Sequence, residues 1–357
     1  MAFQSELLRW FRANQRPLPW RRHHRPYEVW ISEIMLQQTQ METVLPYYAR
    51  WMNAFPTVEK LAASDEKKVL KTWQGLGYYS RARNLRETAR RIVKEFGGKF
   101  PENFEDILSL KGVGRYTAGA IASIAFNQER PIVDGNVLRV LSRLFAIPDP
   151  IDTPSGQARF WKLEESLIPK GRARDFNQAL MELGALVCAP RNPGCGVCPL
   201  SAECASRKAG DPERYPVRSA RKKTVKVHAG AIVLKHDGRY FLRLRPLGKI
   251  MGGLWEFPEW KLAQHRLLDA GGALKRTSAE GRRELAIRPT LAHLGSIRRN
   301  YTHYQETMDV YLAEMPSGTK LRDRSGWKNV WAGKKDFARY PFSSAHARIA
   351  ELVLQKT

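Results

Sequence analysis

The first part of the chain carries apolar side chains at helical spacing. Aliphatic and aromatic residues recur every three or four positions in runs of helix length. Pro and Gly separate the runs, as at Gly97-Gly98 and Pro131. Up to about residue 210 the pattern therefore predicts helices, over residues 26–55, 65–73, 81–96, 106–110, 117–126, 136–145, 156–167 and 175–186.

The pattern changes after residue 217. Residues 218–226, RSARKKTVK, are basic and have no apolar face, which is typical of an exposed linker. Runs rich in β-branched and aromatic residues then flank Asp237-Gly238, a pair that predicts a β-hairpin. The strands that we expect cover residues 227–234, 240–244, 291–297, 307–312 and 328–331.

These patterns predict an α+β protein of two domains. An all-α domain covers residues 1–215, a linker residues 216–226, and a smaller α+β domain residues 227–357. No stretch approaches the ~20 apolar residues that cross a bilayer, and the first residues do not resemble a signal peptide. We therefore expect a protein of the reducing cytoplasm that does not enter a membrane.

The net charge of the chain indicates which class of partner it binds. Lys and Arg number 60 against 35 Asp and Glu, which gives a formal net charge of +25. An excess of this size favours binding to a polyanion, either a nucleic acid or an anionic membrane surface.

All four cysteines fall in one short run, Cys188, Cys195, Cys198 and Cys204, with the spacing C-x6-C-x2-C-x5-C. Four thiolates are the usual ligands of a [4Fe–4S] cluster and also of structural zinc. Zinc sites usually present two CxxC pairs, whereas this run has one. The spacing therefore favours the cluster, with zinc as the alternative, and a reducing compartment argues against disulfides.

A glycine pair lies between two predicted helices, in Leu110-Lys111-Gly112-Val113-Gly114-Arg115. Glycine lets the backbone turn tightly and approach a ligand, and the N–H groups that begin the second helix suit a phosphate. The segment predicts a helix–hairpin–helix that grips a DNA backbone through Gly112, Val113 and Gly114. An ordinary turn between helices is the alternative.

Taken together, these motifs resemble the endonuclease III superfamily of helix–hairpin–helix DNA glycosylases. The resemblance rests on the hairpin, the segment VDGNV at residues 133–137 and the cysteine run. The segment SEIMLQQTQ at residues 32–40 and the additional strand-rich domain are similar to its adenine-specific MutY branch. The likeness is specific through residue 204 and looser afterwards, where GLWEFP at residues 253–258 matches best.

The resemblance implies a base-excision-repair enzyme that hydrolyses the glycosidic bond of mispaired adenine. Its partner is double-stranded DNA with adenine opposite 8-oxoguanine or guanine, and its cofactor is a [4Fe–4S] cluster on the four cysteines. We expect a monomer in a bacterial-type cytoplasm, held at the nucleoid by DNA.

Adenine is a poor leaving group, so its release needs an acid and an anion. Glu33 lies among Trp30, Ile34 and Met35, and burial in such company favours a protonated carboxyl. We expect Glu33 to be the acid, against the alternative of an exposed glutamate on an amphipathic helix.

Asp134 precedes a predicted helix, where an aspartate caps the N-terminus and the helix keeps the carboxylate ionised. The resemblance implies that Asp134 stabilises the cationic sugar, either as nucleophile or by its charge.

Tyr116 stands where bifunctional relatives carry a lysine that forms a Schiff base and cleaves the strand. A phenol lacks that chemistry. We therefore expect a monofunctional enzyme that releases the base and stops.

The resemblance also implies how the base is reached. The flipped adenine contacts Arg21 and Gln178, and Gln38 and Tyr78 act as wedges that fill the gap. Thr39 and Leu76 are expected to face the opposite base. Arg191 lies in the basic cysteine loop, and from that position we expect it to contact phosphate.

The second domain resembles a Nudix fold. Nudix hydrolases bind metal through a glutamate-rich helix, but here Arg283-Glu284-Leu285 is followed by Ala286-Ile287-Arg288, so we expect no metal-dependent hydrolysis. The branch recognises 8-oxoguanine with a Phe-Ser-His tip, and this chain has Tyr301-Thr302-His303. The resemblance thus assigns recognition to Thr302 and His303, with altered hydrogen-bond geometry.

Four other functions compete with this one. Tyr116 and the second domain argue against a glycosylase for oxidised pyrimidines, and a glycosylase for mismatched thymine stays open. The pair of Glu33 and Asp134 argues against a DNA-binding scaffold or redox sensor, which needs neither carboxylate. The missing glutamates argue against a Nudix hydrolase with a DNA-binding extension.

Overall fold

The computed structural model describes residues 2–219, 224–249, 251–262, 291–301, 304–315 and 327–357. The chain divides into two compact units, one of residues 1–64 with 84–221 and one of residues 65–83 with 222–357. The short segment 65–83 thus groups with the strand-rich part of the chain. Among the described residues, no helix is long and apolar enough to cross a membrane.

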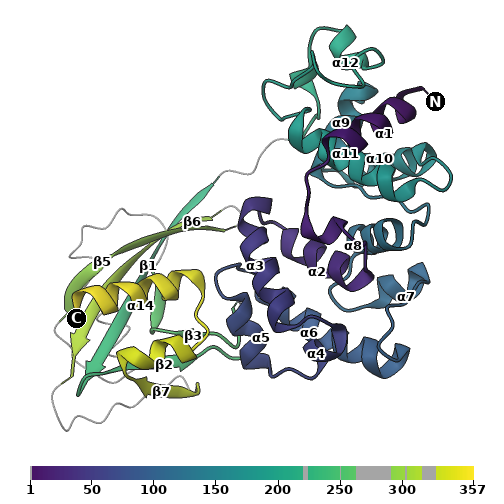
Figure 1. Ribbon diagram of the computed structural model, residues 1–357. Helices are drawn as coiled ribbons and strands as arrows, with labels where there is room; N and C mark the ends of the chain where they lie inside the picture. The colour runs from purple at the N-terminus through teal and green to yellow at the C-terminus, as the bar shows by residue number, and fades with distance from the viewer. Residues whose placement is uncertain (1, 220–223, 250, 263–290, 302–303, 316–326) are drawn as a thin grey trace. The chain divides into compact units, whose positions relative to one another are not determined.

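Helices dominate the first part of the chain, as predicted (Figure 1). Their bounds are α1 Ala2–Asn14, α2 Pro26–Leu36, α3 Met41–Ala54, α4 Val58–Ala62, α5 Glu66–Trp73, α6 Ser80–Phe96, α7 Phe104–Ser109, α8 Arg115–Ala120, α9 Gly135–Leu144, α10 Pro154–Leu167, α11 Ala173–Leu186 and α12 Ala205–Lys208. Short turns add η1 Pro19–Arg21, the π-helical η2 Ile121–Ala125 and η3 Pro212–Arg214. The pattern did not single out α1, α4 or α12 as helices.

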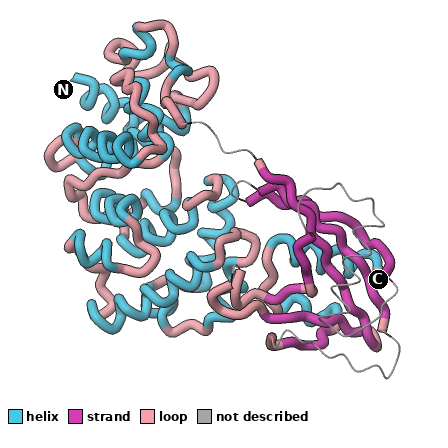
Figure 2. The backbone as a smooth tube through the Cα atoms, turned by 180° about the vertical axis from the view of Figure 1, so that it is seen from behind, coloured by secondary structure: helices cyan, strands magenta, loops and turns pink. Residues whose placement is uncertain are grey.

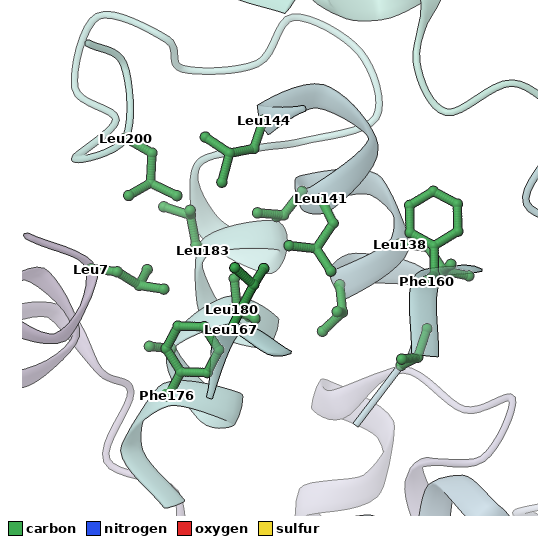
Figure 3. Packing of buried hydrophobic residues seen from close by; sticks show 14 of the residues in the cluster. Leu7, Leu138, Leu141, Leu144, Phe160, Leu167, Phe176, Leu180, Leu183 and Leu200 are labelled. Carbon is green, nitrogen blue, oxygen red and sulfur yellow. The ribbon is translucent and has the colours of Figure 1, made fainter. Parts of the chain in front are cut away.

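One hydrophobic core of the first unit forms between α9 and α11. Leucines of these helices point toward one another and toward Leu7 of α1 and Phe160 of α10 (Figure 3). Leu141 and Leu180 are completely buried. Close packing of this kind resists displacement of a helix axis. It therefore holds the N-terminus of α9, where Asp134 lies, against α11, which carries Gln178.

The second unit is built on a mixed sheet, drawn in magenta in Figure 2. Parallel β1 and β6 are central to it, in the order β3-β2-β1-β6-β5, while β4 pairs with β1 and β7 with β2. The strands are β1 Val225–His236, β2 Arg239–Leu244, β3 Trp255–Glu256, β4 Glu259–Leu262, β5 Leu291–Tyr301, β6 Tyr304–Glu314 and β7 Asn329–Ala332. Two helical segments follow β7, η4 Lys334–Arg339 and α14 Ser344–Lys356.

The predicted hairpin joins β1 to β2. Asp237 and Gly238 both have positive φ, 46° and 71°, as a tight two-residue hairpin turn requires. Strand β1 is buried on both faces, with Val233 packed in the core that α14 covers and Ile232 in the core opposite. Burial on both faces explains the apolar run of residues 229–234 in the middle of the strand.

Candidate active site

A cavity of about 980 Å³ opens in the first unit between α2, α8, α11 and the turn after α2. Seven of the side chains predicted for the site line it: Arg21, Glu33, Gln38, Thr39, Tyr116, Asp134 and Gln178. They come from segments that are far apart in the sequence. Packing of the helices therefore assembles the predicted acid, anion and base-contacting residues around one space.

Glu33 is buried, as predicted, with 5% of its surface exposed. Helix α2 is apolar nearly all round, and this burial raises the pKa of Glu33 to about 7. The Tyr116 hydroxyl donates a 2.8 Å hydrogen bond to Glu33 Oε2 and opposes that rise, whereas the charge of Asp134 adds to it. A large share of Glu33 is therefore protonated at neutral pH.

Asp134 caps α9, as predicted. Its Oδ1 accepts a 2.7 Å hydrogen bond from the Val137 amide and its Oδ2 accepts one of 3.0 Å from Asn136 Nδ2. We expected the helix N-terminus to keep this carboxylate ionised, and the hydrogen bonds there do favour the ionised form. Burial raises the pKa of Asp134 above its ordinary value and outweighs the hydrogen bonds and the charge of Arg139, which lower it.

Both carboxylates act on the phenol of Tyr116. Burial, together with the charges of Glu33 and Asp134, holds the pKa of the phenol well above its ordinary value. The hydroxyl is therefore a permanent donor, and its Oη also lies 3.7 Å from Met181 Sδ.

Arg16 and Glu182 lie beside Arg21 and Gln178 in the wall of this cavity. Arg21 Nε donates to Gln178 Oε1 at 3.1 Å, and Arg21 Nη2 donates to Glu182 Oε2 at 2.9 Å. Arg16 also pairs with Glu182. Sequence reasoning missed Arg16 and Glu182. Glu182 lies one turn after Gln178 on α11, so helical spacing placed it on the same face, but its partners are remote in sequence.

The predicted hairpin lies between α7 and α8. Gly112 has φ 79°, and a Cβ there would meet the side chain of Asn84, which explains the glycine. Gly114 is the N-cap of α8 and provides no capping side chain. Val113 is buried and anchors the turn. The first amides of α8 therefore have no cap from their own N-cap residue.

The two predicted wedges share an unusual backbone. Gln38 and Tyr78 have φ of 55° and 47°, a conformation that few residues other than glycine adopt and that concentrates at functional sites. Tyr78 is 54% exposed, whereas Tyr79 is buried, so only the first of these tyrosines lies on the surface. Leu76 is buried and, like Tyr78, belongs to the second compact unit.

The four cysteines line one small cavity after α11, and none forms a disulfide. The buried guanidinium of Arg143, on α9, donates to Cys188 Sγ at 3.3 Å and to the Ala189 carbonyl at 2.6 Å. A buried cation directed at sulfur suits deprotonated thiols, so the donor set fits a metal centre of four thiolates. Arg143 was not predicted, and Arg191 lies exposed on the same loop.

Comparisons with known proteins show the family of the chain. Residues 31–164 match the HhH-GPD superfamily of base excision DNA repair proteins, and residues 229–352 match the NUDIX domain. The adenine DNA glycosylase of Homo sapiens is 38% identical over 87% of this chain and 66% of its own length. That of Rattus norvegicus is 37% identical over 90% of this chain and 72% of its own length.

The chain belongs to the adenine DNA glycosylase family. A solved structure, that of a thermostable thymine-DNA glycosylase, is 33% identical with a TM-score of 0.54 and covers 58% of this chain and 96% of its own. This adenine DNA glycosylase family member thus combines a helical HhH-GPD domain with a Nudix-like α+β domain, the fold class that we predicted.

The second unit holds a buried group of charged side chains. Glu256, Glu259 and His346 lie close enough to share a metal ion. However, Arg243 pairs with Glu256 at 3.2 Å, and Arg245 pairs with both carboxylates. In the described part of this unit, arginines thus already neutralise these carboxylates.

Several predicted residues lie outside the described part of the chain. These are Thr302 and His303, which fall between β5 and β6, and residues 283–288, where the glutamates of a Nudix hydrolase were missing. Their assignments stay predictions from the sequence.

Proposed function

We propose that this protein hydrolyses the N-glycosidic bond of adenine that is mispaired with 8-oxoguanine or guanine in duplex DNA. One observation carries the proposal. A buried carboxyl with a pKa of about 7, Glu33, faces a cavity that also holds a second carboxyl, Asp134, and the base-contacting side chains Arg21 and Gln178. Binding alone requires neither carboxylate.

Glu33 is the general acid in this proposal. A pKa near the working pH suits a group that must hold a proton and still give it up. Protonation of a ring nitrogen turns adenine into a better leaving group. Tyr116 orients Glu33 through the 2.8 Å hydrogen bond. Because Tyr116 is a phenol and not an amine, the reaction ends with base release.

Asp134 stabilises the sugar once the bond to the base weakens. The sugar becomes an oxocarbenium-like cation, which an adjacent carboxylate stabilises by charge or by covalent attack. Three features favour the ionised form of Asp134 at this moment: the bonds from Val137 and Asn136 and the charge of Arg139. Glu33 and Asp134 thus divide the roles of acid and anion.

The adenine leaves the helical stack to enter the cavity. Arg21 and Gln178 hold the flipped base, while Gln38 and Tyr78 fill the gap that it leaves. Phosphates bind the amides that begin α8 and the exposed Arg191. In the second domain, Thr302 and His303 recognise 8-oxoguanine opposite the adenine.

The four cysteines would hold a [4Fe–4S] cluster. Bound there, it would have a structural role and would fix the loop that presents Arg191 to the DNA. Arg143 supports this loop from α9 through its hydrogen bonds to Cys188, Ala189 and Pro190.

The test measures base release from duplexes with adenine opposite 8-oxoguanine, guanine or thymine, and includes thymine opposite guanine because of the structural relative. We expect release from the first two, and strand breaks only after alkali. Glu33→Gln keeps the shape but has no proton to donate, so it should abolish release and retain DNA binding. Glu28→Gln, on the same helix but outside the cavity lining, is the matched control. Release of thymine alone would contradict the proposal.

A further inference from the structure

Glu182 is the most heavily hydrogen-bonded carboxylate of the cavity wall. Its Oε1 accepts from the Arg16 amide at 2.9 Å and from Arg16 Nε at 2.8 Å. Its Oε2 accepts from Arg16 Nη2 at 2.8 Å and from Arg21 Nη2 at 2.9 Å. The side chain is 1% exposed. Two arginines thus meet on one buried carboxylate.

This arrangement continues to the base pocket. Arg21 holds Gln178 Oε1 with its Nε, and its Nη1 donates to the Arg16 carbonyl. Gln178 Nε2 in turn donates to the Arg174 carbonyl. The three guanidinium nitrogens of Arg21 are therefore each held by a different residue: Nε by Gln178, Nη1 by Arg16 and Nη2 by Glu182.

The balance of charge at Glu182 is also clear. Burial alone would raise the pKa of this carboxyl, but the hydrogen bonds and charges of Arg16 and Arg21 outweigh burial and lower it to about 2. Glu182 is therefore ionised throughout the working range of pH. Removing its charge leaves two guanidinium ions in the wall without their carboxylate.

We propose that Glu182 is a positioning residue, which holds Arg16 and Arg21 in the wall of the base pocket and cancels one of their two charges near Glu33. The inference rests on the function proposed above. It adds Arg16 and Glu182 to the apparatus that selects the base and keeps the acid protonated.

The charge effect has a defined direction. The side chains that act most strongly on Glu33 are Tyr116 from α8, Asp134 before α9 and Arg21 from η1, and the charge of Arg21 favours the ionised form of Glu33. Glu182 acts on Glu33 through Arg21, whose charge it partly cancels. Loss of the Glu182 charge exposes Glu33 to more of this positive field. Less of the acid is then protonated at a given pH, so the pH at which activity is half lost should fall, by up to about 1 unit, the lower end of the shift that an opposite charge in direct contact causes.

The experiment measures single-turnover adenine release against pH in three variants. Arg16, Arg21 and Glu182 together carry +1, so Glu182→Gln makes the wall +2, Arg16→Gln makes it 0, and the double variant returns it to +1. We expect the midpoint to fall in Glu182→Gln, to rise in Arg16→Gln and to return to the wild-type value in the double variant. All three should lose about tenfold or more in rate, because the pocket geometry is lost in each.

Two further variants separate positioning from stability. Glu182→Asp keeps the charge, so its midpoint should stay at the wild-type value while its rate falls. Glu6→Gln breaks an exposed pair with Arg9 on α1 and should change neither quantity. Melting temperature and binding to a duplex with a non-cleavable adenine analogue report folding. If Glu182→Gln does not fold, the proposal is tested by Arg16→Gln alone, whose pH midpoint should rise.

The outcomes are distinguishable. A wild-type protein that releases no adenine from any duplex refutes the proposed function. If the wild type is active and Glu182→Gln has the same midpoint, the role of Glu182 is overturned and the proposed function stands. Where Glu182→Gln does not fold, an unchanged midpoint in Arg16→Gln leads to the same conclusion. A midpoint in the double variant that stays shifted overturns the charge argument as well.

Discussion

The pH dependence of base release should end on the alkaline side at the pKa of Glu33. An acid works only while protonated, so activity is present below this pKa and is lost as the pH rises through about 7. With its ordinary pKa of 4.5, roughly one Glu33 in 300 would be protonated at neutral pH, against about half with the raised value. Burial of α2 thus increases the active fraction by about two orders of magnitude.

Tyr116→Phe tests this reasoning. The phenol donates to the carboxyl at 2.8 Å and stabilises its ionised form, so removal of the hydroxyl should raise the pKa of Glu33. A hydrogen bond to a charged group contributes about 1.5–3 kcal/mol. At about 1.4 kcal/mol per pH unit this corresponds to an upper limit of about 1–2 units. Because the phenol oxygen also accepts from the protonated acid, we expect a shift of about one unit to higher pH.

The assay is the single-turnover rate of adenine release between about pH 5.5 and 9, fitted for its alkaline midpoint. The plateau at low pH should fall as well, because Tyr116 also orients the acid. Tyr27→Phe is the control, since this tyrosine of α2 donates to the Phe55 carbonyl and does not line the cavity. A midpoint in Tyr116→Phe that is unchanged, or that moves to lower pH, would refute the assignment of Glu33 as the acid that limits the rate.

Three further predictions concern the cofactor, the reaction and the lesion. The purified protein should be brown and hold about four irons per chain, as a four-thiolate cubane requires, and one zinc without iron would contradict this. Borohydride should not trap a covalent DNA adduct with the efficiency seen for a true lyase, because Tyr116 has no amine, and trapping of that efficiency would count against the assignment. Changing Thr302 and His303 together to Ala should cost about 1–3 kcal/mol of preference for adenine opposite 8-oxoguanine over guanine, measured by binding and single-turnover rate, and leave binding to undamaged duplex unchanged. Equal discrimination in both proteins would move recognition to Thr39 and Leu76.

Local features of this protein could be predicted because they depend on neighbours in the sequence. The apolar residues around Glu33 indicate that this stretch of α2 is buried, although they do not show which segments cover it. Asp134 caps the helix that begins at the next residue. The turn at Asp237-Gly238 needs only two residues that accept positive φ. The period of apolar positions placed most helices and strands within a few residues of their observed ends.

What the tertiary structure decided involves partners far apart in the chain. Glu182 meets Arg16 across 166 positions, and Arg143 meets Cys188 across 45. Hydrophobic periodicity states which face of α9 or α11 is buried but not which charge lies opposite a buried carboxylate or thiol. The same limit explains Asp134, whose helix cap is local while the burial that raises its pKa comes from other segments. Only the packed fold determines how far each carboxyl is removed from water. That burial raises the pKa values of Glu33 and Asp134 and so decides the chemistry of this cavity.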